Sequence, residues 1–179
     1  MDAHLDAYVF AADATQSAID DALDLVTAGT ARAVLPMPGD DREVYVAVGD
    51  SDATDLLTKL AAVVTIDGLS GVEVHLGIGD GTVNRPFPTH GTVDDYVGFA
   101  LLATAPGNIV SVFEAVWNVS NVAAAAMVGT GSVTVLVEVT SDSNTTVSSA
   151  LSSLAALTGV TSSVLVQGPV ANGAGFTTS

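Results

Sequence analysis

Residues 104–167 read TAPGNIVSVFEAVWNVSNVAAAAMVGTGSVTVLVEVTSDSNTTVSSALSSLAALTGVTSSVLVQ, and this stretch decides the predicted fold. An Ala-Pro-Gly turn precedes apolar residues at helical spacing, and VTVLVEV alternates as a strand does. A second helical pattern follows, and Gly159 separates it from a closing strand. A looser copy of the same pattern occupies residues 11–78, so the sequence predicts one fold used twice.

The two copies keep a nearly constant offset along the chain. Tyr8 recurs as Tyr96, and Gly71-Val72 recurs as Gly159-Val160, each 88 residues later. Each copy reads strand, helix, strand, strand, helix, strand. We therefore predict an α+β fold of two tandem ferredoxin-like (βαββαβ) units with antiparallel sheets. The predicted ranges are 1–80 for the first unit, 81–93 for a linker rich in Gly and Pro, and 94–179 for the second unit with a short polar C-terminal tail.

Composition excludes several classes of function. Apolar residues make up 49% of the 179 residues, which is ample for a packed core, and the absence of Cys excludes disulfides and thiolate chemistry. The net charge is −16, from 20 acids and 4 bases. Direct nucleic-acid binding needs clusters of Lys and Arg and is not expected, and binding to an anionic membrane is disfavoured for the same reason. No apolar run is long enough to span a membrane, and the N-terminus does not read as a secretory signal. The acidity suits either an ordinary acidic surface or adaptation to high salt.

The charge is unevenly spread, and this predicts self-association. Residues 91–179 hold 5 acids and no base, so much of that surface is expected to be covered by other copies or by other assembly subunits. Phe113 and Trp117 fall on one helix face, where they serve either the core or an interface. Alternating valines of the long strand are expected on the sheet face that no helix covers. The predicted interface residues are Phe113, Trp117, Val133, Val135 and Val137.

Histidine is scarce, and one histidine has a carboxylate near it in sequence. His4, His75 and His90 are the three histidines, and Glu73 precedes His75 by two residues in a predicted strand. Side chains two residues apart in a strand share a face, so the two form either an acid–base pair or half a metal site. The alternative is a structural or exposed histidine, and no metal site or catalytic group is assigned on this basis.

Two further patterns favour structural roles. Asp50, Asp52 and Asp55 cluster as in a calcium loop, but position twelve from Asp50 is Ala61 and not Glu. Capping of a helix by Ser51 or Asp52 is therefore the favoured explanation, and loose cation binding is the alternative. Residues 77–81 read GIGDG, which a dinucleotide-binding loop would follow with a helix. The sequence that follows contains two prolines and predicts a linker instead.

The second copy resembles the effector-binding (RAM) domain of the Lrp/AsnC family of regulators. The resemblance rests on TAPG (104–107), MVGTGSVTVLVEV (127–139) and LTGV (157–160), with Thr134 in place of the family's Asp. In the first copy Asp40 and Glu43 take the corresponding places, and the family's DNA-binding helix-turn-helix is absent. VTVLVEVTSD is also similar to a strand and turn of bacterial microcompartment shell proteins. Either resemblance implies assembly, and the first implies binding of a small metabolite.

These patterns lead to two main expectations and a third. The first is a non-enzymatic, self-associating module that binds a small ligand and needs no cofactor or metal, cytoplasmic if cellular. The alternative is a structural assembly protein of a virion, capsid or shell. The third is an enzyme of the dimeric α+β-barrel type, which needs a catalytic histidine or carboxylate; only His75 with Glu73 offers such a group. The predicted ligand-binding residues are Asp40, Glu43, Gly131 and Thr134.

Overall fold

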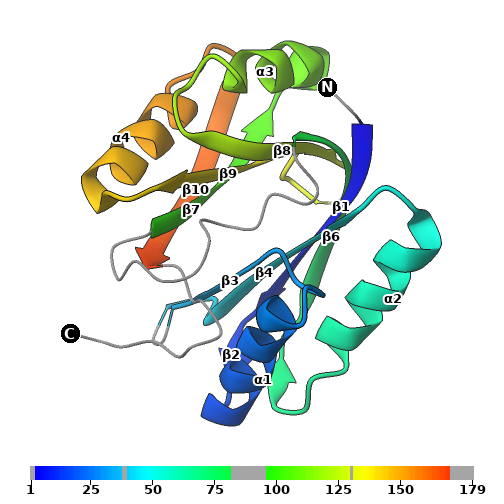
Figure 1. Cartoon of the computed structure of the whole chain (residues 1–179). Helices are drawn as coiled ribbons and strands as arrows, with labels where there is room; N and C mark the ends of the chain where they lie inside the picture. Colours follow the sequence, from blue (N-terminus) through cyan, green and yellow to red (C-terminus); the bar gives the residue numbers. More distant parts are fainter. Residues whose placement is uncertain (1–2, 38–39, 82–95, 130, 170–179) are drawn as a thin grey trace. The chain divides into compact units, whose positions relative to one another are not determined.

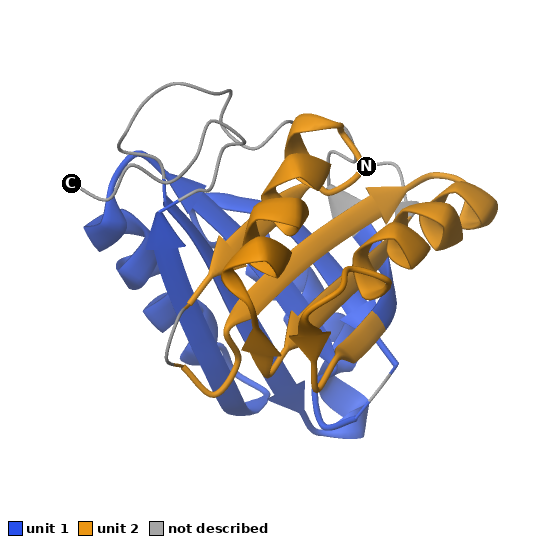
Figure 2. Ribbon diagram, turned by 90° about the horizontal axis from the view of Figure 1, so that it is seen from below, with its two compact units in different colours: residues 1–3, 76–82, 94–169 blue, residues 4–75, 83–93, 170–179 orange. Residues whose placement is uncertain are grey.

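The computed structural model describes residues 3–37, 40–81, 96–129 and 131–169, and it shows an α+β chain with antiparallel strand pairing. The α+β class and the antiparallel sheets predicted from the sequence are confirmed. The chain divides into two compact units, coloured in Figure 2. Unit 2 comprises residues 4–75, 83–93 and 170–179, and unit 1 comprises residues 1–3, 76–82 and 94–169.

Unit 2 is built from the first half of the chain. Its strands β1, β4 and β3 follow one another in the sheet, and β6 lies on the other side of β1. The two helices lie along these strands in Figure 1, and a two-stranded ladder, β2 with β5, accompanies them. The elements are β1 (Ala3–Ala11), β2 (Asp13–Ala14), α1 (Gln16–Thr27), β3 (Ala33–Pro36), β4 (Val44–Asp50), α2 (Ala53–Val64), β5 (Leu69–Ser70) and β6 (Glu73–Gly81).

Apart from the short β2–β5 ladder, the helices and strands of unit 1 follow the order found in unit 2. Its sheet runs β10-β7-β9-β8, and the second part of β6, from Gly77 onward, pairs with β8. The elements are β7 (Tyr96–Thr104), the 3-10 turn η1 (Pro106–Asn108), α3 (Ile109–Val116), β8 (Val122–Val128), β9 (Val135–Ser141), α4 (Asn144–Ala155) and β10 (Val160–Pro169).

Local sequence explains where the helices begin. The side chain of Thr15 accepts the backbone N–H of Ala18 at the start of α1, and Asp52 accepts two backbone N–H groups at the start of α2. Ser143 does the same for α4. These side chains satisfy donors that the first turn of a helix leaves without a partner. The predicted capping role of the aspartate cluster is therefore confirmed at Asp52.

Each sheet buries one face beneath its own two helices. In unit 2 the alternate residues Ala7, Val9 and Ala11 of β1 pack with Ile19 and Leu23 of α1. In unit 1 the core joins β7, β8 and β9 to α3 and α4. Because side chains alternate across a strand, the other residues of each strand lie on the face that carries no helix of the same unit. That face of unit 2 carries the candidate site.

The valines of strand β9 lie on the opposite face of the sheet from the one predicted. Val135, Val137 and Val139 are fully buried in the core beneath α3 and α4, together with Val112 and Leu151. The prediction that Val135 and Val137 lie on the uncovered face is therefore wrong. Strand alternation placed them correctly on one common face, but it cannot tell which face the helices cover.

Other predictions concern the extent of the units. The compact units divide inside β6, between His75 and Leu76, whereas the predicted first unit ended at residue 80. The linker beyond residue 81 and the tail from residue 170 lie outside the described residues, so the predicted ranges stay a prediction. Among the described residues, no helix is long and apolar enough to cross a membrane.

Candidate functional site

Buried polar and aromatic side chains occupy the helix-free face of the unit 2 sheet. Asp6 is 0% exposed and His75 is 2% exposed, and Tyr8, Phe10 and Tyr45 are buried beside them in the same sheet. Burying a charged or polar group is costly unless it is hydrogen-bonded or paired. A face that concentrates such groups is therefore a better candidate for function than the aliphatic core on the other side of the sheet.

The first cluster is centred on His75 and is called the His75 network below; it consists of Phe10, Arg42, Tyr45, Glu73 and His75. His75 Nε2 lies 2.7 Å from Glu73 Oε1. The other oxygen of this carboxylate, Oε2, accepts from Arg42 Nη2 at 2.9 Å and from Arg42 Nε at 3.3 Å. A carboxylate only accepts, so in this geometry Nε2 carries the proton and the imidazole is held in one orientation. The predicted pairing of His75 with Glu73 is confirmed as a contact.

Aromatic rings pack around this pair. The Phe10 ring centroid lies 4.9 Å from that of Tyr45 and 5.3 Å from that of His75. The Arg42 guanidinium carbon lies 5.6 Å from the Phe10 centroid, within the range of a cation–π contact. The imidazole is thus fixed by a carboxylate on one side and by rings on another, while Arg42 and Glu73 are half-buried. The network is buried at His75 and reaches solvent at Arg42 and Glu73.

Charges within the network shift its ionisation. Burial alone would raise the pKa of Glu73, but the hydrogen bond and charge of Arg42, with a further contribution from His75, hold that pKa below its usual value. Burial raises the pKa of Tyr45, although the nearby Arg42 opposes the shift. Burial also acts to lower the pKa of Arg42, but Glu73 outweighs it and the pKa is raised. Glu73 is therefore a carboxylate and Arg42 a cation near neutral pH.

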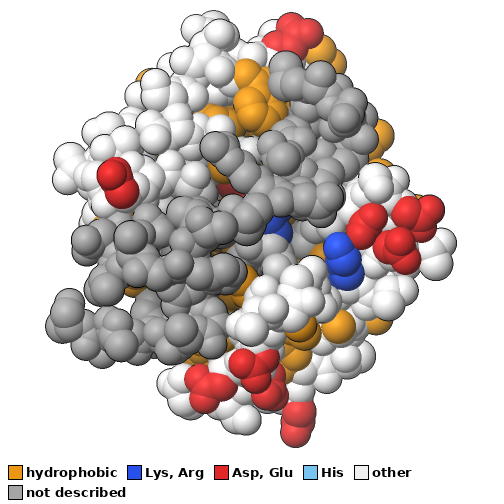
Figure 3. Space-filling view, viewed as in Figure 1, with side chains coloured by type: hydrophobic (Ala, Val, Ile, Leu, Met, Phe, Trp, Pro, Cys, Tyr) orange, Lys and Arg blue, Asp and Glu red, His pale blue; other side chains and the backbone are white. Residues whose placement is uncertain are grey.

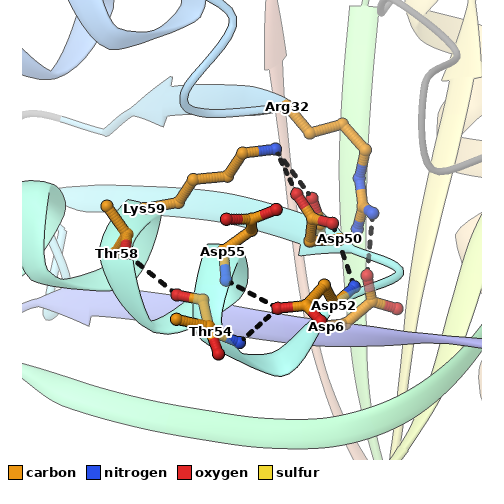
Figure 4. Close-up of polar contacts among 9 residues, drawn as sticks. Asp6, Arg32, Asp50, Asp52, Thr54, Asp55, Thr58 and Lys59 are labelled. Carbon is orange, nitrogen blue, oxygen red and sulfur yellow. Dashed lines mark hydrogen bonds and ion pairs between the residues drawn. The ribbon is translucent and has the colours of Figure 1, made fainter.

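A second cluster lies on the same face. Arg32 Nη1 donates to Asp6 Oδ1 at 2.8 Å, and Arg32 Nη2 donates to Tyr8 Oη at 3.2 Å. Figure 4 shows Arg32 reaching this carboxylate from outside the strand. Gly49 makes room for the pair, because a Cβ added there would lie 2.5 Å from Arg32 Nη1. The sequence analysis did not identify Arg32 or Arg42 as site residues. The signal that could have found them is their rarity, because the chain has only 4 bases against 20 acids.

The residues predicted to bind a ligand are engaged in other contacts or exposed. Glu43 Oε2 accepts the backbone N–H of Ala14 at 3.0 Å, and Asp40 is exposed in the loop that precedes β4. In unit 1 the Thr134 hydroxyl donates to the Leu102 carbonyl at 3.1 Å, and Gly131 is exposed in the turn that precedes β9. Within unit 2 the predicted turn does bring Arg42, which lies between Asp40 and Glu43 in sequence, to the His75 network.

The remaining predicted residues lie at the edge of the unit 1 core. Phe113 and Trp117 contact edge to face with ring centroids 6.5 Å apart, and both pack against the core beneath α3 and α4. Val133 is half-buried just before β9. An interface role for these three residues stays a prediction.

The aspartates at the start of α2 form a capped helix end. Asp52 Oδ1 accepts the backbone N–H of Thr54 at 2.8 Å, and Lys59 Nζ lies 2.9 Å from Asp50 Oδ2 (Figure 4). Among the described residues, no group of three or more metal-binding side chains gathers in one place. Residues 77–81, which carry GIGDG, are paired strand residues of β6.

Comparison with known proteins identifies the fold. No protein-family model matches the chain, and no curated protein matches it by sequence. Solved structures do match. A mutant chlorite dismutase from Candidatus Nitrospira defluvii in complex with cyanide has a TM-score of 0.60 at 10% identity, covering 93% of this chain and 90% of that one. A heme-binding protein from Thermus thermophilus has a TM-score of 0.54 at 12% identity, covering 95% and 92%. A proposed monooxygenase from Fusobacterium nucleatum has a TM-score of 0.61 at 11% identity, covering 94% and 92%.

These matches overturn several expectations. The resemblances to Lrp/AsnC effector domains and to shell proteins are wrong, because the solved structures that share the fold over nearly the whole chain are of another kind. The expectation of a non-enzymatic ligand-binding module is contradicted, since a chlorite dismutase is an enzyme. The alternative of a virion, capsid or shell component finds no support among them. At 10–12% identity the likeness shows the fold alone.

The His75 network contains an oriented histidine, an imidazole with a carboxylate bonded to one ring nitrogen. Histidine is a common axial ligand of heme, and a ligating histidine usually donates its other ring N–H to a carboxylate or carbonyl. His75 is the one histidine whose side chain the structure describes, and it already holds such a carboxylate, Glu73, at 2.7 Å. Residues 94–169 contain no histidine at all, so unit 1 offers no imidazole in that range.

Proposed function

We propose that this chain carries out heme-related chemistry or heme binding, with the His75 network as its centre. The single observation that carries the proposal is the buried His75 imidazole held by Glu73 in a fold that a heme-binding protein and a chlorite dismutase also have. Buried histidine–carboxylate pairs cluster at functional sites because the surrounding fold must position and neutralise them. Heme, when bound, would supply the redox chemistry.

Each residue of the network has a separate role in this proposal. His75 would be the iron ligand, and Glu73 would fix the ring and raise its basicity. Arg42 holds the Glu73 carboxylate in its ionised form through two hydrogen bonds. Phe10 and Tyr45 would present aromatic surface next to the ligand.

A hemin titration tests the proposal. Hemin is added to the purified chain, and the Soret absorbance and its position are recorded until saturation. We expect a saturable complex in wild type, loss of the His-ligated band in His75→Ala, and about 10–100-fold weaker binding in Glu73→Gln. His4→Ala and His90→Ala are the matched controls, because they remove the other two histidines of the sequence. Absence of a saturable band in wild type, or an unchanged band in His75→Ala, would overturn the proposal.

A second candidate is acid–base catalysis by the same pair without a cofactor. One observation favours it: the three basic side chains that the structure describes, Arg32, Arg42 and Lys59, each pair with a carboxylate. Heme propionates would have to compete for those cations. Turnover of an enolisable or phenolic substrate without hemin, lost in His75→Ala, would support this candidate. Equal activity of His75→Ala would exclude it.

We also infer that the two halves are tandem ferredoxin-like units. They share the element order βαββαβ, and their strand orders β6-β1-β4-β3 and β10-β7-β9-β8 correspond element by element. The recurrence of landmarks 88 residues apart supports a duplicated ancestor. An experimental structure in which the two units superpose over four strands and two helices would support this inference, and unrelated strand orders would refute it. A cytoplasmic location stays a prediction.

A further inference from the structure

Glu43 fixes the end of the β3–β4 hairpin against strand β1. Its backbone N–H donates to the Ala11 carbonyl at 2.9 Å, and its own carbonyl accepts the N–H of Met37 at 2.7 Å. Its side-chain oxygen Oε2 accepts the backbone N–H of Ala14 at 3.0 Å. Three hydrogen bonds therefore hold the backbone in one place immediately beside Arg42.

Arg42 reaches from this anchor across strand β1 to strand β6. In the sheet, β1 lies between β4, which follows Arg42 in sequence, and β6, which carries Glu73. The Arg42 guanidinium carbon lies 5.6 Å from the ring centroid of Phe10 on β1. Its nitrogens Nε and Nη2 then reach the same oxygen of Glu73, Oε2, at 3.3 Å and 2.9 Å. One side chain thus spans three neighbouring strands.

The bond to one oxygen of Glu73 leaves the other oxygen directed at the histidine. Oε1 lies 2.7 Å from His75 Nε2, and the His75 side chain is 2% exposed while that of Glu73 is 44% exposed. An exposed carboxylate that forms a single contact is easily drawn away by water. The two nitrogens of Arg42 oppose this, because turning Glu73 toward water would break both of their bonds. Arg42 therefore keeps Oε1 within reach of Nε2.

Basic side chains are scarce in this chain, which makes the position of each one informative. The sequence has 4 bases against 20 acids, and acidic side chains outnumber basic ones on the face in view in Figure 3. Lys59 pairs with a carboxylate at the start of α2, and Arg32 pairs with one on β1. Arg42 pairs with a carboxylate that in turn holds a histidine.

We propose that Arg42 is a positioning residue for His75, which acts through Glu73 and is itself placed by Glu43. The inference deepens the proposed function and rests on it for the use of the imidazole. Arg42 suits this role because its planar fork presents two nitrogens in a fixed geometry, which the ammonium group of lysine cannot do. Glu43, predicted from the sequence to bind a ligand, has an anchoring role in this arrangement.

Nitrogen-15 NMR of the chain without hemin tests the inference by following the Nε2–H proton of His75. The signal is assigned by its loss in His75→Ala, and its exchange with water is measured near neutral pH. We expect slow exchange in wild type and exchange about tenfold faster in Arg42→Met, because the Glu73 contact then opens more often. Arg42→Lys should give an intermediate rate, since it keeps the charge but offers one nitrogen.

Two further variants separate positioning from general stability. Glu43→Ala removes the acceptor of the Ala14 N–H and should also speed the exchange, by less than Arg42→Met does. Lys59→Met is the matched control, because it removes a cation that pairs with Asp50 outside the His75 network. Its exchange rate should equal that of wild type. Backbone NMR spectra and thermal unfolding check that each variant is folded.

The outcomes distinguish the positioning role from the proposed function. An Nε2–H that exchanges equally fast in wild type and Arg42→Met would overturn the positioning role, as would an equal acceleration in Lys59→Met. If Arg42→Met speeds the exchange but wild type does not bind hemin, the positioning role stands and the proposed function fails. If hemin binds through His75 while Arg42→Met leaves the exchange unchanged, the proposed function stands and the positioning role fails.

Discussion

Replacing Arg32 by methionine removes the cation that the structure pairs with Asp6. The Asp6 side chain is 0% exposed and the Arg32 side chain is 5% exposed, with 2.8 Å between Arg32 Nη1 and Asp6 Oδ1. Removing one partner of a buried ion pair costs about 3–5 kcal/mol, because the remaining charge stays out of water. With an m-value of about 2 kcal/mol/M, that loss lowers the urea midpoint by about 1.5–2.5 M.

Urea unfolding followed by circular dichroism measures this loss, and two further variants isolate its cause. The double variant Asp6→Asn with Arg32→Met leaves no charged side chain at either of these two positions, so we expect it to lose only about 1–3 kcal/mol and to be more stable than Arg32→Met alone. Lys59→Met removes the same charge from a more exposed pair with Asp50 and is expected to cost at most about 1 kcal/mol. A loss below about 1 kcal/mol for Arg32→Met, or a double variant less stable than the single one, would show that Arg32 does not offset a buried Asp6 charge.

Three more predictions follow from close contacts and from the carboxylate of the site. Gly49→Ala should cost about 1–3 kcal/mol in urea unfolding, because the new Cβ lies 2.5 Å from Arg32 Nη1; a neutral result would contradict the tight fit. Gly77→Ala should lower the free energy of unfolding by a similar amount, because the new Cβ collides with the backbone carbonyl of Met127. Gly129→Ala is the control: its Cβ meets no atom within 4 Å, so its stability should change by less than about 0.5 kcal/mol. The pKa of Glu73 is lowered in the fold, so its stabilising contribution is present above its usual pKa of 4.5 and is lost as pH falls below that value. Glu73→Gln should therefore lose less stability than wild type below pH 4.5. Parallel curves of unfolding free energy against pH for the two proteins would count against the ion pair.

Local signals in the sequence predicted most of the elements. The strand predicted at residues 122–128 is β8 without change, and the predicted hairpin of the second and third strands is the β3–β4 pair. Side-chain alternation also predicted that Glu73 and His75 share a face, which the 2.7 Å contact confirms. These features depend on neighbours within a few residues, and short sequence patterns report them well.

Long-range pairing could not be predicted in the same way. Arg32 meets Asp6 across 26 residues, and Arg42 meets Glu73 across 31. The scarcity of basic residues was a usable signal. A buried carboxylate needs a cation beside it, so the few arginines of an acidic chain are expected to lie next to buried carboxylates. The side of the sheet occupied by Val135 and Val137 depends on how the crossover helices pack, which strand periodicity does not encode. The family resemblance failed because its motifs describe turns and strands that many α+β folds share.

Rescue by free imidazole tests whether His75 is the residue that binds hemin, as proposed above. His75→Gly removes the ring that Glu73 orients, and hemin absorbance is recorded with and without tens of millimolar imidazole. We expect a His-ligated Soret band in wild type, its loss in His75→Gly and its return when imidazole is added. A band in His75→Gly that equals wild type before imidazole is added would show that His75 is not the ligand.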